Sequence, residues 1–444
     1  MSIIKRFANQ TLEDLYNRVT GDEDARVCKD IPEKACNDQP RNFFAYLWAN
    51  VFGKVADEIA SAKLVIPWLF GSLGVPAAFT GFLVPIREAG VLLPQLIVAA
   101  AIRHLAIRKY VWLLGSILSS LSLFGMAIAA ISLDGYKAGL AIITMLIIFS
   151  LSRGLCSVSA KDVLGKTVSK SRRGALMGWS VSLSGFVILG MGIWLSNINL
   201  NDSGMTIFAG FLVTGGIFWL IAAIIFALIK EQPGAIDGGG NAISVALKQL
   251  SLIKTDEAFR KFLISRALLL SVALAPPFYV LIAQSISGTN LLGLGALIIA
   301  NGLASSFSAP FWGYMGDKSS RQVMVIATLG TGMLGIFVNI AIILDWNLVL
   351  SELGMALMFL VLSVMHSGAR LGRKVYLVDM SNADNRAAYV AVSNTVIGVL
   401  MILAGGIGLL GDFFGPDSVI LILGLVSILA AYFIHSIPDV SLKD

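Results

Sequence analysis

Basic and polar side chains recur at helical spacing inside two otherwise apolar stretches of the chain. In the first stretch they are Ser150, Arg153, Ser157 and Lys161. In the second they are Ser363, His366, Arg370 and Lys374. Successive members lie three or four residues apart, so a helix places each set on one face. Guanidinium groups bind carboxylates and phosphates through paired hydrogen bonds, so these two faces are suited to an anionic ligand.

Three side chains are candidates for moving a proton. His366 is one candidate because an unperturbed imidazole titrates near neutral pH, although a lone histidine in an apolar helix is as often a packing residue. Arg87 and Glu88 follow Pro85 at the start of another apolar stretch. A carboxylate held inside a membrane can load and release a proton as its surroundings change. The alternative for Arg87 and Glu88 is a solvated ion pair in a loop.

The two polar faces belong to a longer internal repeat. Arg108 corresponds to Arg321, a shift of 213 residues because 321 minus 108 is 213. The same shift relates Gly192 to Gly405, and it holds without a gap from 100–192 to 313–405. Duplicated helix bundles are how many membrane transporters build a central site between two halves.

Composition identifies an integral membrane protein. Hydrophobic residues make up 57% of the 444 residues and charged residues only 14%, against about 25% charged in a soluble domain. A helix needs about 20 mostly apolar residues to cross the hydrocarbon core, and twelve stretches meet this need. We expect spans near 63–84, 86–103, 110–132, 138–160, 174–196, 206–229, 262–287, 291–315, 321–343, 352–376, 386–411 and 417–437.

The charges predict the orientation of these spans. Alternate connections are rich in lysine and arginine, among them 103–109, 161–173 and 370–386, whereas the others hold mainly acidic residues. Because basic loops stay in the cytoplasm, we expect both termini there, in a bacterial inner membrane. The net charge of +6 therefore reflects topology and does not indicate a nucleic-acid partner.

Three segments lie outside the two expected bundles at 62–229 and 262–437. Residues 1–61 form a cytoplasmic tail, 230–261 a linker that contains three consecutive glycines, and 438–444 a short C-terminal tail. Within the first tail, apolar residues recur at helical spacing over 42–60. This pattern fits an amphipathic helix in the membrane interface, or equally an extension of the first span.

Enzymatic chemistry is not indicated. The chain has no glycine-rich phosphate-binding loop followed by lysine and serine or threonine, so ATP-driven transport is not supported. Its three histidines lie on separate spans without metal-ligand spacing, and we expect no metal and no cofactor.

One loop carries a family signature. Gly313 is followed after four residues by Asp317 and after four more by Arg321, at the boundary of the eighth and ninth spans. Asp379 precedes Arg386 by seven residues at the boundary of the tenth and eleventh spans. Both patterns resemble the major facilitator superfamily.

The resemblance implies a fold and a function. The fold is all-α, with twelve transmembrane helices in two pseudo-symmetric bundles, and the function is secondary transport by alternating access. Gly313 is expected to let two helices approach, while Asp317 caps the next helix or pairs across the inner gate. Arg321, Arg108, Asp379 and Arg386 belong to the same gate. In the first half His104 replaces the aspartate of the loop and Lys166 replaces Asp379, so that half of the gate is degenerate.

In this family the first, fourth, seventh and tenth spans line the cavity. The resemblance therefore directs five residues to it: Lys63, Arg153, Arg266, His366 and Arg370. We expect a small anionic organic substrate, with protons as the coupling ion. The alternative for Lys63, Lys161 and Lys374 is that they anchor helices at the membrane surface. The alternative function is a transporter-like protein that assembles membrane or pigment complexes.

Overall fold

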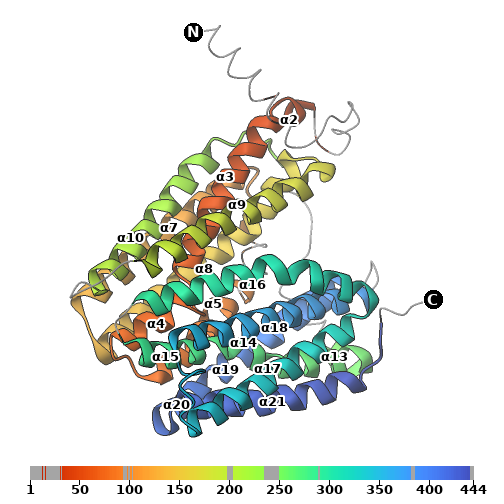
Figure 1. Cartoon of the computed structure of the whole chain (residues 1–444). Coiled ribbons are helices and arrows are strands. Elements are labelled where there is room, and N and C mark those ends of the chain that lie inside the picture. Colours follow the sequence, from red (N-terminus) through yellow and green to blue (C-terminus); the bar gives the residue numbers. More distant parts are fainter. Residues whose placement is uncertain are drawn as a thin grey trace.

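A computed structural model describes residues 13, 16, 31, 33–93, 98, 101–102, 104–197, 204–234, 250–288, 291–381 and 386–440, excepting the side chains at 170, 171, 204, 386 and 387. Every element in this part of the chain is a helix, and the helices form two bundles (Figure 1). The first bundle contains α2 (Glu33–Asn37), α3 (Gln39–Ile59), α4 (Val65–Ser72), α5 (Ala77–Leu92), α7 (Lys109–Ser132), α8 (Gly135–Thr167), α9 (Lys170–Ser196) and α10 (Gly204–Ala227). The second contains α12 (Leu252–Thr255), α13 (Glu257–Leu268), α14 (Leu270–Leu274), α15 (Pro276–Ser287), α16 (Leu291–Lys318), α17 (Ser320–Ile343), α18 (Glu352–Asp379), α19 (Arg386–Ala404), the 3₁₀ turn η2 (Gly405–Ile407), α20 (Gly408–Phe414) and α21 (Pro416–Ser436).

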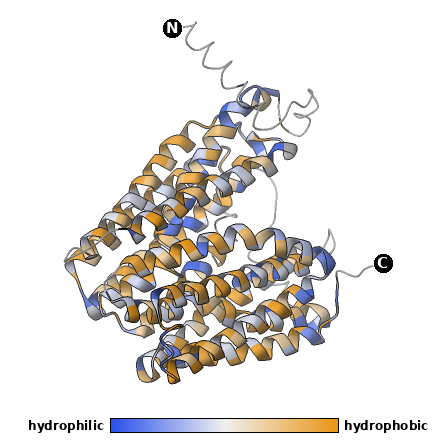
Figure 2. Cartoon of the chain, viewed as in Figure 1, coloured by the Kyte–Doolittle hydropathy of each residue, from blue (hydrophilic) through white to orange (hydrophobic). Residues whose placement is uncertain are grey.

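The chain is an integral, multi-pass membrane protein. Ten of its helical segments are long and apolar enough to cross a membrane, judged over the described residues. Hydrophobic residues run along the helices, and hydrophilic ones gather around α2 and near the C-terminal end of the chain (Figure 2). Large apolar side chains such as Phe186 and Phe307 are about three-quarters exposed, as lipid contact requires.

The first bundle begins earlier than the sequence predicts. Helix α3 packs against α9 and α10, and Phe43, Leu47, Val51 and Val55 on it are buried. Of the two alternatives for this segment, the structure fits the extension of the first span and not the interfacial helix, because α3 leads into α4 and is packed inside the bundle. The tail boundary placed at residue 61 is correspondingly wrong.

The opening helix of each bundle is broken. In the first bundle α3 ends at Ile59 and α4 begins at Val65. Pro67 lies in the first turn of α4, where its missing N–H leaves no hydrogen bond unmade. In the second bundle Pro276 and Pro277 open α15 after the short α14. Such breaks are tolerated at membrane depth where they are buried in protein or line a cavity.

The backbones of the two bundles pack closely at one end, which we call the closed end. There Gly192 on α9 lies against Gly295 and Ile298 on α16, and Gly81 on α5 lies against Gly405 and Gly408. At the other end, where α3 begins and α21 finishes, a Cβ added to Gly174 on α9 or Gly313 on α16 would meet no atom within 4 Å. We call this the open end, because the facing helices α9 and α16 separate toward it.

Candidate functional site

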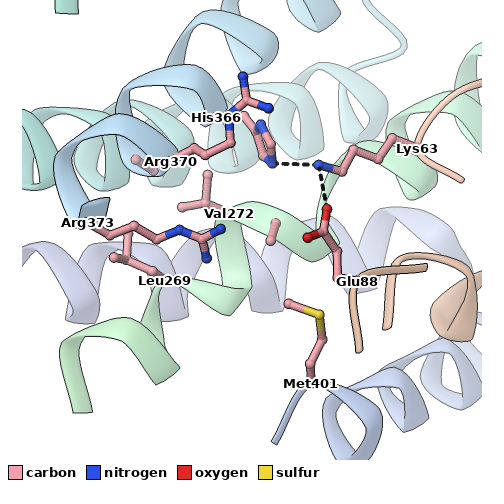
Figure 3. Close-up of a pocket in the computed structure, with 10 residues that line it drawn as sticks. Lys63, Glu88, Leu269, Val272, His366, Arg370, Arg373 and Met401 are labelled. Atoms are coloured by element: carbon pink, nitrogen blue, oxygen red, sulfur yellow. Dashed lines mark hydrogen bonds and ion pairs between the residues drawn. The ribbon is translucent and has the colours of Figure 1, made fainter. Parts of the chain in front are cut away.

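The cavities of interest lie between the bundles. One is lined from the first bundle by Lys63 and Glu88, and from the second by Leu269, Val272, Ala273, His366, Ala369, Arg370, Arg373 and Met401 (Figure 3). A second cavity, of about 160 Å³, adjoins it. Lys63, His366 and Arg370 line both, so these three side chains stand at the junction.

The cationic face of α18 lies toward this junction because the opposite face of the helix packs against α16 and α17. Gly368 lies against the ring of Trp312 on α16, and Gly372 lies against Met324 on α17. Side chains at these two positions would push α18 away from its neighbours. His366, Arg370 and Arg373, spaced four and three residues apart, occupy the remaining face.

Lys63 connects the two bundles at the junction. It lies in the break between α3 and α4, and its Nζ is 3.1 Å from His366 Nε2 and 3.7 Å from Glu88 Oε1. A charged ammonium has donors but no acceptor, so His366 accepts this hydrogen bond through an unprotonated Nε2. A proton on that nitrogen removes the hydrogen bond and places two positive charges side by side.

The second cavity has a different character. Its polar lining includes hydroxyl groups and one carboxylate: Glu58, Ser61, Asn301, Ser305, Ser363 and Ser367. Asn301 Nδ2 on α16 donates to Glu58 Oε1 on α3 over 2.8 Å, a second polar contact between the bundles. Beyond the shared Lys63, His366 and Arg370, the first cavity, which we call the cationic chamber, adds Arg373, whereas the second adds mainly hydroxyl groups and Glu58.

Arg153, expected in the cavity, lies instead inside the first bundle. Its guanidinium donates to Asp57 Oδ2 over 3.1 and 2.8 Å, and it covers the ring of Trp219 at 4.4 Å. Arg87, expected to take part in proton coupling, donates to the other oxygen of Asp57 over 3.2 Å. Because Asp57 occupies both guanidinium groups, neither residue lines the cavities. The polar stripe of α8 is not the counterpart of the stripe of α18.

Arg266 lies one layer behind the cationic chamber and is only 7% exposed. Its guanidinium donates to Ser393 Oγ over 2.5 Å and to Asn394 Oδ1 over 2.9 Å, both on α19. Both partners are neutral, so the positive charge of Arg266 is not compensated by these contacts.

The signature loop of the second half has roles other than those expected. Gly313 faces open space, and Gly316 is the glycine that packs, 3.0 Å from Leu371 once a Cβ is added. Ser319 rather than Asp317 caps α17, accepting from the N–H of Gln322 over 3.1 Å. Asp317 is exposed and forms no ion pair with a described residue.

Arg321 of this loop is bound to the C-terminal segment. It donates to the carbonyl oxygens of His435 and Ile437 over 3.1 and 3.0 Å, and Asp439 lies 3.5 Å from its Nε. Asp379 has its own interactions, but the side chain of Arg386 lies outside the described residues, so the pairing expected between them stays a prediction.

The first half builds an equivalent anchor from different residues. Glu231, just after α10, accepts from the backbone N–H of Arg108 and of Lys109 over 2.9 and 2.7 Å, which satisfies the start of α7. The Arg108 guanidinium pairs with Asp162, and Lys166 pairs with Asp162 over 2.7 Å and with Glu231 over 3.0 Å. Glu231, which follows α10, therefore holds the start of α7 in the first half. Asp439, which follows α21, lies against Arg321 at the start of α17 in the second half.

Sequence reasoning missed two residues that matter here. Asp57 lies in the segment expected as an interfacial helix or an extension of the first span, and no ion pair was expected for it. Arg373 was counted among the loop charges, although its three-residue spacing from Arg370 was a sufficient signal for a shared helix face.

Known structures share this architecture. No protein-family model and no curated protein sequence matches the chain. Among solved structures, a D-xylose–proton symporter matches with a TM-score of 0.66 at 15% identity, covering 89% of this chain and 97% of that one. A variant of the nucleoside transporter NupG matches with a TM-score of 0.68 at 13% identity, covering 90% and 100%. A POT family transporter in complex with a thioalcohol-conjugated peptide matches with 0.67 at 13%, covering 92% and 98%.

These likenesses span both bundles and nearly the whole of each compared chain. They agree with the arrangement of the helices in two bundles. The all-α, two-bundle fold class is therefore confirmed, and the chain has the fold of the major facilitator superfamily transporters.

Proposed function

We propose that this chain is a secondary transporter that moves a small anionic organic solute across the membrane by alternating access, coupled to protons. The observation that carries the proposal is the cationic junction between the bundles, where Lys63, Arg370 and Arg373 line the cavity with a single carboxylate, Glu88. Charges buried at membrane depth are costly and are kept where they bind a ligand or an ion. The solved transporters of the same fold support transport as the activity.

The open and closed ends suggest how the two bundles could move during transport. Contacts at the closed end involve backbone and small side chains, which can separate without leaving buried charges unpaired. An anion at the junction attracts Lys63 from the first bundle and Arg370 from the second, and so favours closure around it. Proton coupling rests on His366, because protonation of Nε2 ends its hydrogen bond with Lys63.

Uptake into proteoliposomes tests the proposal. Labelled small carboxylates and organic phosphates are offered with and without an inward proton gradient. We expect uptake that Arg370→Gln reduces about tenfold or more, since one partner of a desolvated charge pair is lost. Lys137→Gln, an exposed lysine near the closed end, should leave uptake unchanged. Absence of anion uptake by the wild-type protein, or full uptake by Arg370→Gln, contradicts the proposal.

The proton step has its own arm in the same experiment. We expect the gradient to stimulate uptake by the wild-type protein and not by His366→Gln, whose amide can still accept from Lys63 but cannot titrate. His435→Gln changes an exposed histidine at the other side of the second bundle and should keep the stimulation. Equal stimulation of all three proteins removes His366 from the coupling mechanism.

A further inference from the structure

The guanidinium groups of Arg370 and Arg373 are uncompensated within the cationic chamber. Over the residues that the structure describes, neither has a carboxylate oxygen within the 4.0 Å of an ion pair. Figure 3 shows Arg370 reaching the side of His366, and Arg373 extending toward Lys63 and Glu88. Three residues of helix separate their Cα atoms by about 4.5 Å along the axis, so the two forks can bind one small ligand together.

The neighbouring acidic groups do not cancel these charges. Glu88 is the carboxylate nearest to Lys63, at 3.7 Å, and Glu58 accepts from the amide of Asn301. Arg266 adds a fourth cation behind the chamber, held only by neutral partners. Four cationic side chains against two carboxylates leave an excess of two positive charges in the described site.

An excess of this size in a membrane interior calls for a matching ligand charge. Uncompensated charges in a low dielectric are strongly unfavourable, whereas a paired and hydrogen-bonded set is tolerated. A monoanion would leave one guanidinium without a counter-charge. Two negative charges satisfy both forks, and the carbon skeleton between or beside them would face the hydroxyl groups of the second cavity.

We propose that the solute carried by this site is a dianion, either a short dicarboxylate or a phosphomonoester, with Arg370 and Arg373 as its paired ligands. This inference rests on the proposed function and narrows it. Arg373 is then the residue that makes the site select two charges over one, because it supplies the second unpaired guanidinium.

The test compares ligands that differ in one charge. Succinate is paired with 4-hydroxybutyrate, and glycerol 3-phosphate with glycerate, near pH 7.5. Binding to the full-length protein in detergent is measured by thermal stabilisation, and transport by competition for uptake in proteoliposomes. We expect the dianion of at least one pair to bind about tenfold or more tightly than its monoanion. The pair that responds identifies the dicarboxylate or the phosphomonoester source.

Variants of one position make the inference decisive. Arg373→Gln should weaken the dianion about tenfold or more and bring its affinity to that of the monoanion. Arg373→Lys keeps the charge and should retain the preference for the dianion. Lys137→Gln removes an exposed cation near the closed end, away from the chamber, and should change neither affinity.

Failure of the inference differs from failure of the proposed function. If both monoanions bind and are transported as well as the dianions, or if Arg373→Gln keeps the full preference, the dianion assignment is overturned and anion transport stands. If no anion of either charge binds or is transported, both proposals fall.

Discussion

Asp57 holds two arginines that would otherwise repel each other inside the first bundle. Its two carboxylate oxygens accept from Arg87 and from Arg153, and each of the three side chains is only about 20% exposed. The arrangement fixes the positions of α3, α5 and α8 relative to one another. Charged side chains thus occur in two settings in this protein: in ion pairs within a bundle, and as cations without an ion-pair partner between the bundles.

Asp57→Asn should destabilise the protein without a change in side-chain shape. Two largely buried guanidinium groups lose the one carboxylate that pairs with them among the described residues, and breaking a buried ion pair typically costs about 3 kcal/mol or more. Thermal unfolding in detergent measures the loss as a lower midpoint. Asp134→Asn, at an exposed turn without a side-chain cap, serves as the matched control. Equal midpoints for the two variants would show that the Asp57 cluster contributes little to stability.

The sequence predicted some of these residues and not others for physical reasons. His366, Arg370 and Lys63 reach the cavity as expected from the spacing on α18 and from the family resemblance. Arg153 has the same spacing on α8, yet the position of its side chain depends on Asp57, a residue ninety-six positions earlier (153 minus 57). Spacing identifies the face of a helix, but only tertiary contacts decide what that face meets.

The internal repeat predicted the positions of the helices better than hydropathy did. Adding 213 to the bounds of α7, Lys109–Ser132, gives 322–345, against Ser320–Ile343 for α17. The same operation on Gly192 gives Gly405, and both glycines lie at the closed end. Helix α3 escaped detection as a span because Lys54, Asp57 and Glu58 lower its hydropathy. These charges are tolerated because the bundle, and not the lipid, surrounds them.

The glycine contacts of the closed end make a prediction at the scale of elements. A Cβ at Gly81 would lie 2.4 Å from the carbonyl oxygen of Gly405 and 2.6 Å from the N–H nitrogen of Gly408, both backbone atoms that cannot move aside alone. Gly81→Ala should therefore shift the protein toward conformations in which this end is open. Gly178→Ala on α9, where a Cβ meets nothing within 4 Å, is the matched control.

Spin labels at the exposed positions of Tyr136 and Phe413, one on each bundle, report the opening of the closed end. We expect the distance between them to lengthen in Gly81→Ala and to stay as in the wild type in Gly178→Ala. An unchanged distance in Gly81→Ala would show that the tight packing of these glycines does not hold the closed end together.

At the scale of the whole molecule, the two helical bundles meet at a junction where cationic side chains outnumber carboxylates. The contacts across it are few and polar: Lys63 with His366, and Asn301 with Glu58. We expect both to change when a proton or an anion binds, whereas the networks around Asp57, Asp162 and Asp439 each lie within one bundle. The duplicated fold was predictable from the repeat. The difference between the two halves was not predictable, because it depends on which buried cations form ion pairs with carboxylates.

The most direct test of alternating access is the distance between the bundles at both ends while an anion binds. Labels at Met177 and Tyr314 report the open end, and labels at Tyr136 and Phe413 report the closed end. With saturating succinate or glycerol 3-phosphate, we expect a population in which the 177–314 distance is shorter and the 136–413 distance is longer. If neither distance changes with either anion, the two bundles do not alternate around this site, and the account is contradicted.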